Sequence, residues 1–166
     1  MMEKNLRKLE FDKILDILSH FARTFIGKHH CLSLLPFSNI DDIKKELAET
    51  REATIMLQRK GEIPLSEISD ITVSLKFLKA AYSISSKQLL DLASLLKLSR
   101  NLKEYFSLDI GILDTFPNLD TYFSSLYSNK SIEDNIFSCI IDENTIDDKA
   151  SSELYKIRKQ QIKISR

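Results

Sequence analysis

The stretch CIIDENTIDDKASSELYKIRKQQIKISR, residues 139–166, indicates what kind of fold the whole chain adopts. It contains an acidic turn, a pair of serines suited to capping a helix, and the start of an amphipathic helix. Three apolar side chains and one glutamine in this helix fall at alternating spacings of three and four, as in a helix that packs lengthwise on a neighbour. These positions are Leu154, Ile157, Gln161 and Ile164. No capping glycine and no proline follows, so we expect the chain to be part of a longer polypeptide.

Charge is distributed unevenly around the start of this helix. Residues 131–153 carry seven acidic side chains and one basic side chain, whereas residues 154–166 carry five basic side chains and no acidic one. Four of the basic side chains are candidates for weak phosphate contacts: Lys156, Arg158, Lys159 and Lys163. The exposed face of a coiled coil has the same composition, and the residues alone favour that second interpretation.

The overall composition is that of an ordinary globular domain. The 166 residues are 43% hydrophobic and 29% charged, and their formal net charge is zero. A neutral chain exerts no strong attraction on nucleic acid or on an anionic membrane. Two cysteines, Cys31 and Cys139, do not make a disulfide framework, and no apolar run approaches the roughly 20 residues of a membrane span. We therefore expect a soluble cytoplasmic protein with reduced thiols and no membrane partner.

Sparse glycine and proline predict an all-α fold. Three residues of each type are too few to connect the many strands of a sandwich or a barrel. Apolar periodicity predicts an irregular bundle of about seven or eight helices. Residues 87–106 are apolar on most of their circumference, which is typical of a central helix. The expected caps are Thr24, Asn39 with Gly61 as terminator, Ser69 or Asp70, Ser85 or Ser86, Ser131 with Asp134, and Ser151 or Ser152.

Residues 140–147 are the one candidate for β-structure. Asp142, Glu143 and Asn144 fit a tight turn between two isoleucine-containing arms, with Asn144 tolerating a positive φ. A tiny hairpin and a plain loop are both compatible with this pattern.

No group of residues in the sequence predicts catalysis or a metal site. Adjacent side chains of a helix point about 100° apart, so His29, His30 and Cys31 do not converge on one ion. The acidic residues 142–148 lack the glycine of a calcium loop. The phosphate-binding patterns GxxxxGK[ST] and GxGxxG and the nucleophile pattern GxSxG are absent. We expect no catalytic, cofactor-binding or metal-ligating residue in this chain.

Two blocks of sequence resemble the second bacterial branch of the MutS family, the type-II, recombination-suppressing, Smr-containing paralogues. The first is LRKLEFDKILDILSHFARTFIGKHHCLSLLPFSNIDDIKKELAETREATIML, residues 6–57, with LEFDKIL, Gly27-Lys28, Leu35-Pro36 and ETREA as the matching pieces. The second is IIDENTIDDKASSELYKIR, residues 140–158, which is similar to the acidic turn, Ala-Ser cap and Leu-x-x-Ile-Arg helix start of that branch. Asn144 departs from the pattern, because a glycine is commoner there.

The resemblance implies that residues 1–150 form a helical core segment and that residues 151–166 begin a long lever helix. The remainder of such a parent would supply a dimerising ATPase that uses ATP and magnesium, a clamp, and a C-terminal Smr endonuclease domain. The clamp would embrace branched DNA or ribosomes, in suppression of homologous recombination or rescue of collided ribosomes. None of the family's catalytic positions falls in this chain.

The sequence therefore predicts a non-catalytic connector between an ATPase and a clamp, with Leu154, Ile157 and Ile164 as the seam of the lever. Its partner would be the remainder of its own polypeptide, in a homodimeric parent. By itself the chain would be a monomer or an adventitious dimer through the open seam. The alternative is a stand-alone helical module for protein–protein interaction.

Overall fold

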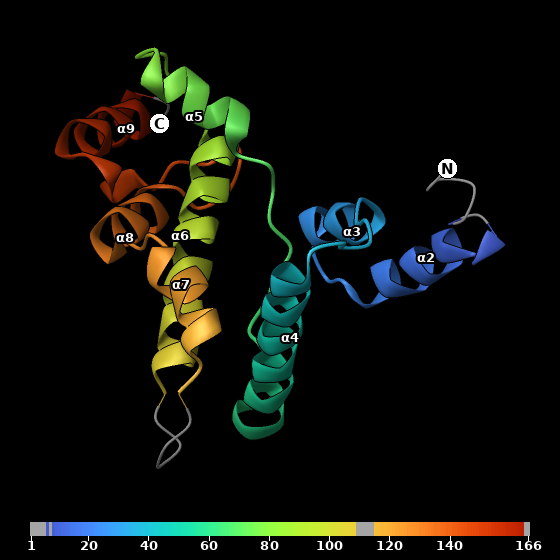
Figure 1. Cartoon of the computed structure of the whole chain (residues 1–166). Helices are drawn as coiled ribbons and strands as arrows, with labels where there is room; N and C mark the ends of the chain where they lie inside the picture. The colour runs from blue at the N-terminus through green and yellow to red at the C-terminus, as the bar shows by residue number, and fades with distance from the viewer. Residues whose placement is uncertain (1–5, 7, 109–114, 165–166) are drawn as a thin grey trace. The chain divides into compact units, whose positions relative to one another are not determined.

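The computed structural model describes residues 6, 8–108 and 115–164, and helices dominate these ranges (Figure 1). The described residues contain α-helices labelled α2 to α9, one 3-10 turn and no β-strand, so the all-α prediction is confirmed. The helices are α2 Phe11–Phe21, α3 Phe25–Leu32, α4 Ile40–Lys60, α5 Thr72–Lys79, α6 Ser86–Ser107, α7 Pro117–Ser125, α8 Lys130–Cys139 and α9 Ser152–Ile164. The 3-10 turn η1, Asp148–Ala150, lies between α8 and α9. None of the helices in these ranges has the length and apolar content needed to cross a membrane.

Side-chain caps begin several helices as the sequence predicts. Thr24, Asn39, Ser85 and Ser151 each accept a hydrogen bond from a first-turn amide, at 3.0, 2.9, 3.3 and 3.0 Å respectively. Each cap satisfies an amide that has no partner within its own helix. Gly61 ends α4 with φ 76°, a conformation that costs glycine no steric strain.

The predicted start of α8 is wrong. The sequence suggests Ser131 with Asp134 as a capping box, but the helix begins at Lys130 and Asn129 caps it, its Oδ1 accepting from the Ile132 amide at 3.1 Å. Asp134 pairs instead with Lys130 at 2.9 Å, one helical turn away. Asparagine and serine cap helices about equally well, so capping propensity does not distinguish Asn129 from Ser131.

The described chain divides into two compact units, which we describe separately. Unit 1 contains residues 1–68 and 102–126, and unit 2 contains residues 69–101 and 127–166. The core of unit 1 is formed by Met56, Tyr105, Phe116 and Leu119, with Met56 only 1% exposed. A stacked pair of rings, Phe106 and Phe123 with centroids 4.3 Å apart, packs beside it.

Within unit 1, α4 supplies the cap that α7 lacks. Phe116 precedes α7 and has no capping side chain. The carboxylate of Glu52 accepts from the backbone amides of Asn118 and Leu119, at 3.0 and 3.2 Å, and also from the Asn118 side chain. A negative charge at a helix N-terminus also interacts favourably with the helix dipole. Glu52 therefore fastens α7 to α4.

The other end of α4 fastens the end of α6 in the same unit. Lys60 Nζ donates to the backbone carbonyls of Tyr105, at 3.3 Å, and Phe106. These carbonyls lie in the last turn of α6, where cations are favoured. Tyr105 Oη returns a hydrogen bond of 2.7 Å to the Gly61 carbonyl.

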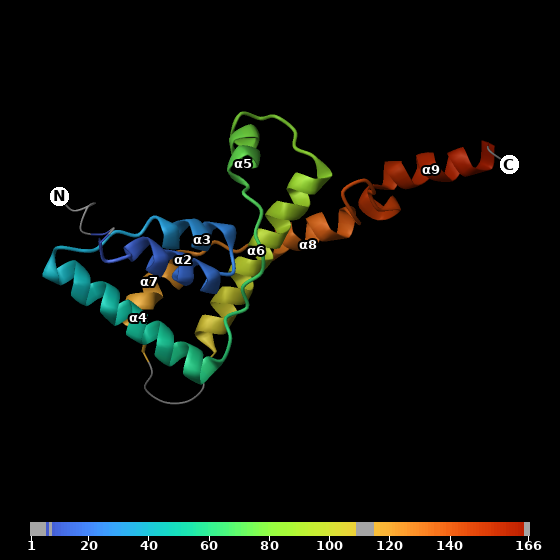
Figure 2. The same cartoon turned by 90° about the vertical axis from the view of Figure 1, so that its right-hand side faces the viewer.

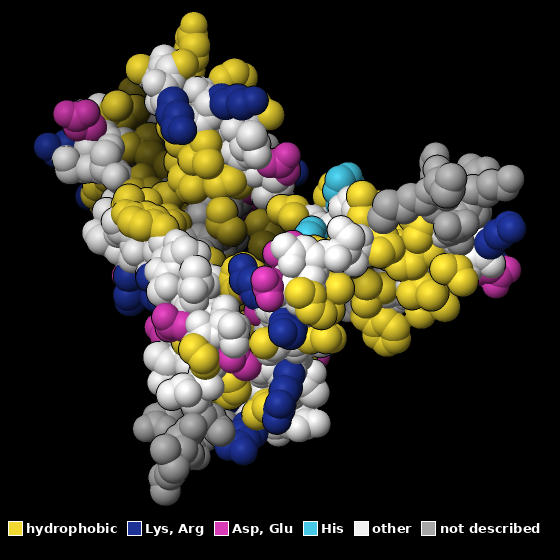
Figure 3. Space-filling view, viewed as in Figure 1, with side chains coloured by type: hydrophobic (Ala, Val, Ile, Leu, Met, Phe, Trp, Pro, Cys, Tyr) yellow, Lys and Arg dark blue, Asp and Glu magenta, His cyan; other side chains and the backbone are white. Residues whose placement is uncertain are grey.

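The amphipathic α2 packs against α3, but much of its apolar side remains open. Figure 3 shows hydrophobic side chains gathered over these two helices. The exposed large side chains there are Ile14, Ile17, Leu18, Phe21, Phe25, Ile26 and Leu32. The described part of unit 1 leaves this face uncovered.

In unit 2, α6 supplies most of the buried side chains, and the prediction that residues 87–106 are central is confirmed. Ala93, Leu96, Leu98 and Ser99 are all buried. The same helix continues into unit 1, where Tyr105 is buried.

Candidate functional site at the root of the last helix

The segment between α8 and α9 forms a minimal hairpin, which we call the root of α9 (residues 139–151). A single antiparallel bridge joins Ile140 and Ile146. The Ile141 amide donates to the Thr145 carbonyl at 3.0 Å, and the Asp147 amide donates to the Cys139 carbonyl at 2.8 Å. Of the two structures that the sequence left open, the small hairpin is therefore confirmed, as one bridge without strands in the described residues.

Asp142 organises the turn of this hairpin. Its Oδ1 accepts from the Asn144 amide at 2.8 Å, and its carbonyl accepts from the Thr145 amide at 3.3 Å. The Asn144 amide, followed by the Thr145 hydroxyl, lowers the pKa of Asp142 because both donate to its charged form. The expectation that Asn144 uses a positive φ is wrong, since it is absent from the positive-φ residues of the described chain. The Asx hydrogen bond of Asp142 shapes the turn instead.

The exit from the hairpin into α9 is held by local hydrogen bonds. Asp147 Oδ1 accepts from the Lys149 amide at 2.7 Å, and the Asp147 carbonyl accepts from the Ala150 amide at 3.0 Å. Ser151 then caps α9. In Figure 2, α9 follows η1 and extends away from α8 toward the end of the chain.

Arg158 connects the second turn of α9 back to the root. Its Nη1 donates to the Ile146 carbonyl at 2.9 Å and also pairs with the carboxylate of Asp148. The same region of α9 packs against η1. Arg158 was a candidate for phosphate contact, but the structure directs it to its own chain.

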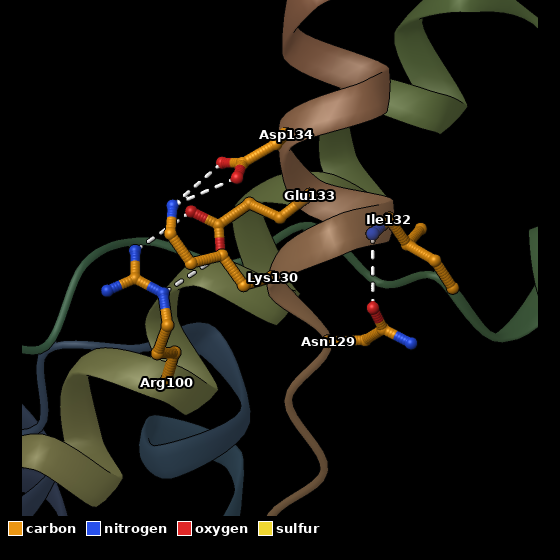
Figure 4. A network of polar contacts seen from close by, with 6 residues as sticks. All are labelled: Arg100, Asn129, Lys130, Ile132, Glu133 and Asp134. Atoms are coloured by element: carbon orange, nitrogen blue, oxygen red, sulfur yellow. Dashed lines mark hydrogen bonds and ion pairs between the residues drawn. The ribbon is translucent and has the colours of Figure 1, made fainter.

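Two ion pairs fasten α8 and the root to α6 within unit 2. Arg100 of α6 forms a bidentate pair with Glu133 of α8, with Nε–Oε2 and Nη2–Oε1 distances of 3.1 and 2.9 Å (Figure 4). The Glu133 side chain is 5% exposed, and the hydrogen bonds from Arg100 lower its pKa. Lys87 of α6 pairs with Glu143 in the turn at 3.1 Å.

The predicted seam residues lie along α9 with unequal exposure. Leu154 is half-buried near the root, whereas Ile157 is 60% exposed and Ile164 is 85% exposed. Nothing in the described chain covers the outer part of this seam. Its role as a helix–helix contact therefore stays a prediction.

The predicted phosphate-contacting residues do not form one group. Lys156, Lys159 and Lys163 are exposed and, at about 100° per residue, share one side of α9, while Arg158 is engaged with the root. Lys159 Nζ lies 5.6 Å from the centroid of the Tyr155 ring, so one of the three lysines already makes a cation–π contact within α9. Their contact with phosphate is an open prediction.

The remaining candidate features among the described residues are metal-ligating groups and free thiols. No three His, Cys, Asp or Glu side chains in those ranges are grouped so that they can hold a metal ion. Cys31 and Cys139 are half-buried free thiols. A hollow of about 440 Å³ in unit 1 is lined by the Arg23–Glu62 ion pair and mainly by apolar side chains.

Comparison with known proteins gives one consistent result. No protein-family profile matches the chain. Proteins named Endonuclease MutS2 are similar to it: that of Clostridium acetobutylicum is 35% identical over 159 residues, and that of Ruminiclostridium cellulolyticum is 38% identical over 162 residues. The protein of the same name from Geobacillus sp. is 34% identical over 160 residues. Each match covers 96% of this chain but only 20% of the relative's length.

Proposed function

Since this chain belongs to the MutS2 family, we propose that it is a non-catalytic connector that joins a dimeric ATPase to a clamp in a larger MutS2 protein. The ATPase with its ATP and magnesium, the clamp that holds branched DNA or ribosomes, and an Smr endonuclease domain would all lie outside these residues. The parent would act in recombination suppression or in rescue of collided ribosomes. Residues 1–150 would form the core segment and residues 151–166 the start of the lever.

The observation that carries this proposal is the series of joints in unit 2. The Arg100–Glu133 pair joins α6 to α8, and the Ile140–Ile146 bridge continues α8 into the root. Arg158 then ties the root to α9. A displacement of α6 would pass along this series to α9 without any step that needs a bound cofactor. Such a series of contacts is what a connector requires.

The seam of α9 provides the test. Replacing Ile157→Asp in the full-length protein puts a charge into the proposed helix contact, and we expect the dependence of DNA or ribosome binding on ATP to be lost. Ile162 has the same 60% exposure but lies away from the seam, so Ile162→Asp is the matched control. Binding whose response to ATP is the same in both variants would contradict the proposal.

A stand-alone interaction module is the second candidate. The open apolar face of α2 and α3 favours it, because large exposed apolar patches mark sites of association. The coding sequence decides between the two: a GxxxxGK[ST] pattern downstream of residue 166 supports the connector, and a stop codon there supports the module.

A further inference from the structure

Arg158 occupies a position from which one side chain can set the direction of a whole helix. It lies six residues after Ser152, which is about 9 Å along the axis from the start of α9. From there it reaches back to the Ile146 carbonyl, at 2.9 Å, and to the Asp148 carboxylate. A contact at this distance from the helix start resists tilting, whereas the Ser151 cap at the end itself does not.

The segment that carries α9 is suited to bending. Residues 147–151 contain one three-residue 3-10 turn between two extended residues, with Asp147 at ψ 142° and Ser151 at φ −149° and ψ 151°. No continuous helix runs from α8 into α9, so small changes at these two residues reorient α9. Short segments of this type commonly act as hinges.

The contact is also weak enough to open. The Arg158 and Asp148 side chains are 39% and 56% exposed, so water and salt reach both charges. Exposed pairs of this kind are only slightly favourable and are screened by salt. Arg100–Glu133, by contrast, is largely buried and holds α8 firmly to α6.

We propose that Arg158, with Asp148 and the Ile146 carbonyl, is a releasable latch that fixes the direction of α9, and that α9 swings about residues 147–151 when the latch opens. The proposal rests on the role of α9 as the root of a lever. It gives Arg158 a positioning role in place of a phosphate contact. The connection between α6 and α8 is rigid, and the connection between the root and α9 is the one that can move.

The direction of α9 can be measured in this chain by the distance between two nitroxide labels in unit 2. The labelled positions are Asn135→Cys on α8 and Gln160→Cys on α9, in a background of Cys31→Ser and Cys139→Ser. We expect one narrow distance distribution at low salt. Arg158→Gln should raise the population of other distances about fivefold, as expected for the loss of a weak ion pair. Raising the salt to about 1 M should broaden the distance distribution of the doubly labelled chain that keeps Arg158 in the same way.

Lys156→Gln removes the same charge from the same helix without touching the root. The distance distribution of this variant should therefore match that of the labelled chain that keeps both Lys156 and Arg158. Asp148→Asn opens the latch from the other side and leaves α9 unchanged, which keeps the test valid where Arg158→Gln lowers helicity. Distributions that are the same in Arg158→Gln, Asp148→Asn and Lys156→Gln would overturn the latch. The connector role is tested separately by ATP coupling in the full-length protein, so either proposal can fail alone.

Discussion

Ala81 is a single residue held in a conformation that suits glycine. It follows α5 with φ 59°, while the Tyr82 amide donates to the Phe77 carbonyl at 2.9 Å, as in a Schellman motif. A non-glycine residue in this left-handed region is strained by its Cβ.

Replacing Ala81→Gly should therefore stabilise the chain by about 1 kcal/mol, because relief of the strain exceeds the added entropy of the unfolded chain. Chemical denaturation measures the change. Ala80→Gly is the control, since Ala80 has φ −88° and gains nothing from glycine. Equal effects of the two substitutions would show that the left-handed conformation is not strained.

Glu133 is a buried carboxylate of unit 2. Replacing Glu133→Gln removes the carboxylate that forms the largely buried bidentate pair with Arg100. We expect a loss of about 2 kcal/mol in the free energy of unfolding at neutral pH. Glu153→Gln, in the exposed first turn of α9, should change it little.

The same residue predicts a pH dependence. Arg100 lowers the pKa of Glu133 in the folded state, so the unfolded state binds the proton more readily. The stabilisation by Glu133 is fully present above the pKa of about 4.3 that this carboxyl has in the unfolded state. It is lost as the pH falls through the lower pKa of the folded state. The difference in unfolding free energy between the unsubstituted chain and the Glu133→Gln variant should therefore shrink only below about pH 4.3. A constant difference across the acid range would exclude this explanation.

At the scale of elements, the N-terminal cap of α7 depends on one carboxylate of α4, while Tyr122 of α7 separately donates to Glu49 of α4 at 2.9 Å. The carboxylate of Glu52 accepts from the amides of Asn118 and Leu119. Glu52→Gln replaces one of its two acceptor oxygens with an NH₂ group, which is a donor and cannot accept from those amides. We expect hydrogen exchange of the first-turn amides of α7 to accelerate by roughly tenfold, in line with the loss of a cap. Glu46→Gln is the control on the same helix, because the Glu46 side chain is exposed. Unchanged exchange at Leu119 would show that Glu52 is not the cap.

At the scale of the whole molecule, charge predicts how the isolated chain behaves toward nucleic acid. Its net charge is zero, and of its four predicted phosphate contacts Arg158 is engaged with the root, which leaves the three exposed lysines of α9. We expect no measurable salt-sensitive binding to duplex DNA, branched DNA or RNA in fluorescence anisotropy between 50 and 200 mM salt, a range over which three phosphate contacts would weaken binding by roughly 40-fold. Tight binding that weakens steeply over that range would contradict this expectation and identify the lysines as a binding surface.

The amino-acid sequence by itself determined the features that depend on neighbours along the chain. Asn39, Gly61 and Ser151 mark helix ends because capping bonds join residues two to four positions apart. The all-α class and the two family blocks are likewise readable without coordinates. The prediction of the start of α8 was wrong because two adequate capping residues, Asn129 and Ser131, lie close together. Capping propensity alone does not rank them.

Only the tertiary structure decided which distant charges meet and which apolar faces stay open. Glu52 caps a helix 66 residues away, and Arg100 pairs with a residue 33 positions away, separations that no local period encodes. Arg158 looks like a phosphate ligand in the sequence, because its partners on the root become neighbours only when α9 packs on η1. The stripe on α2 looks like core for the same reason: periodicity shows that a face is apolar, but only the packing of other elements determines whether it is covered.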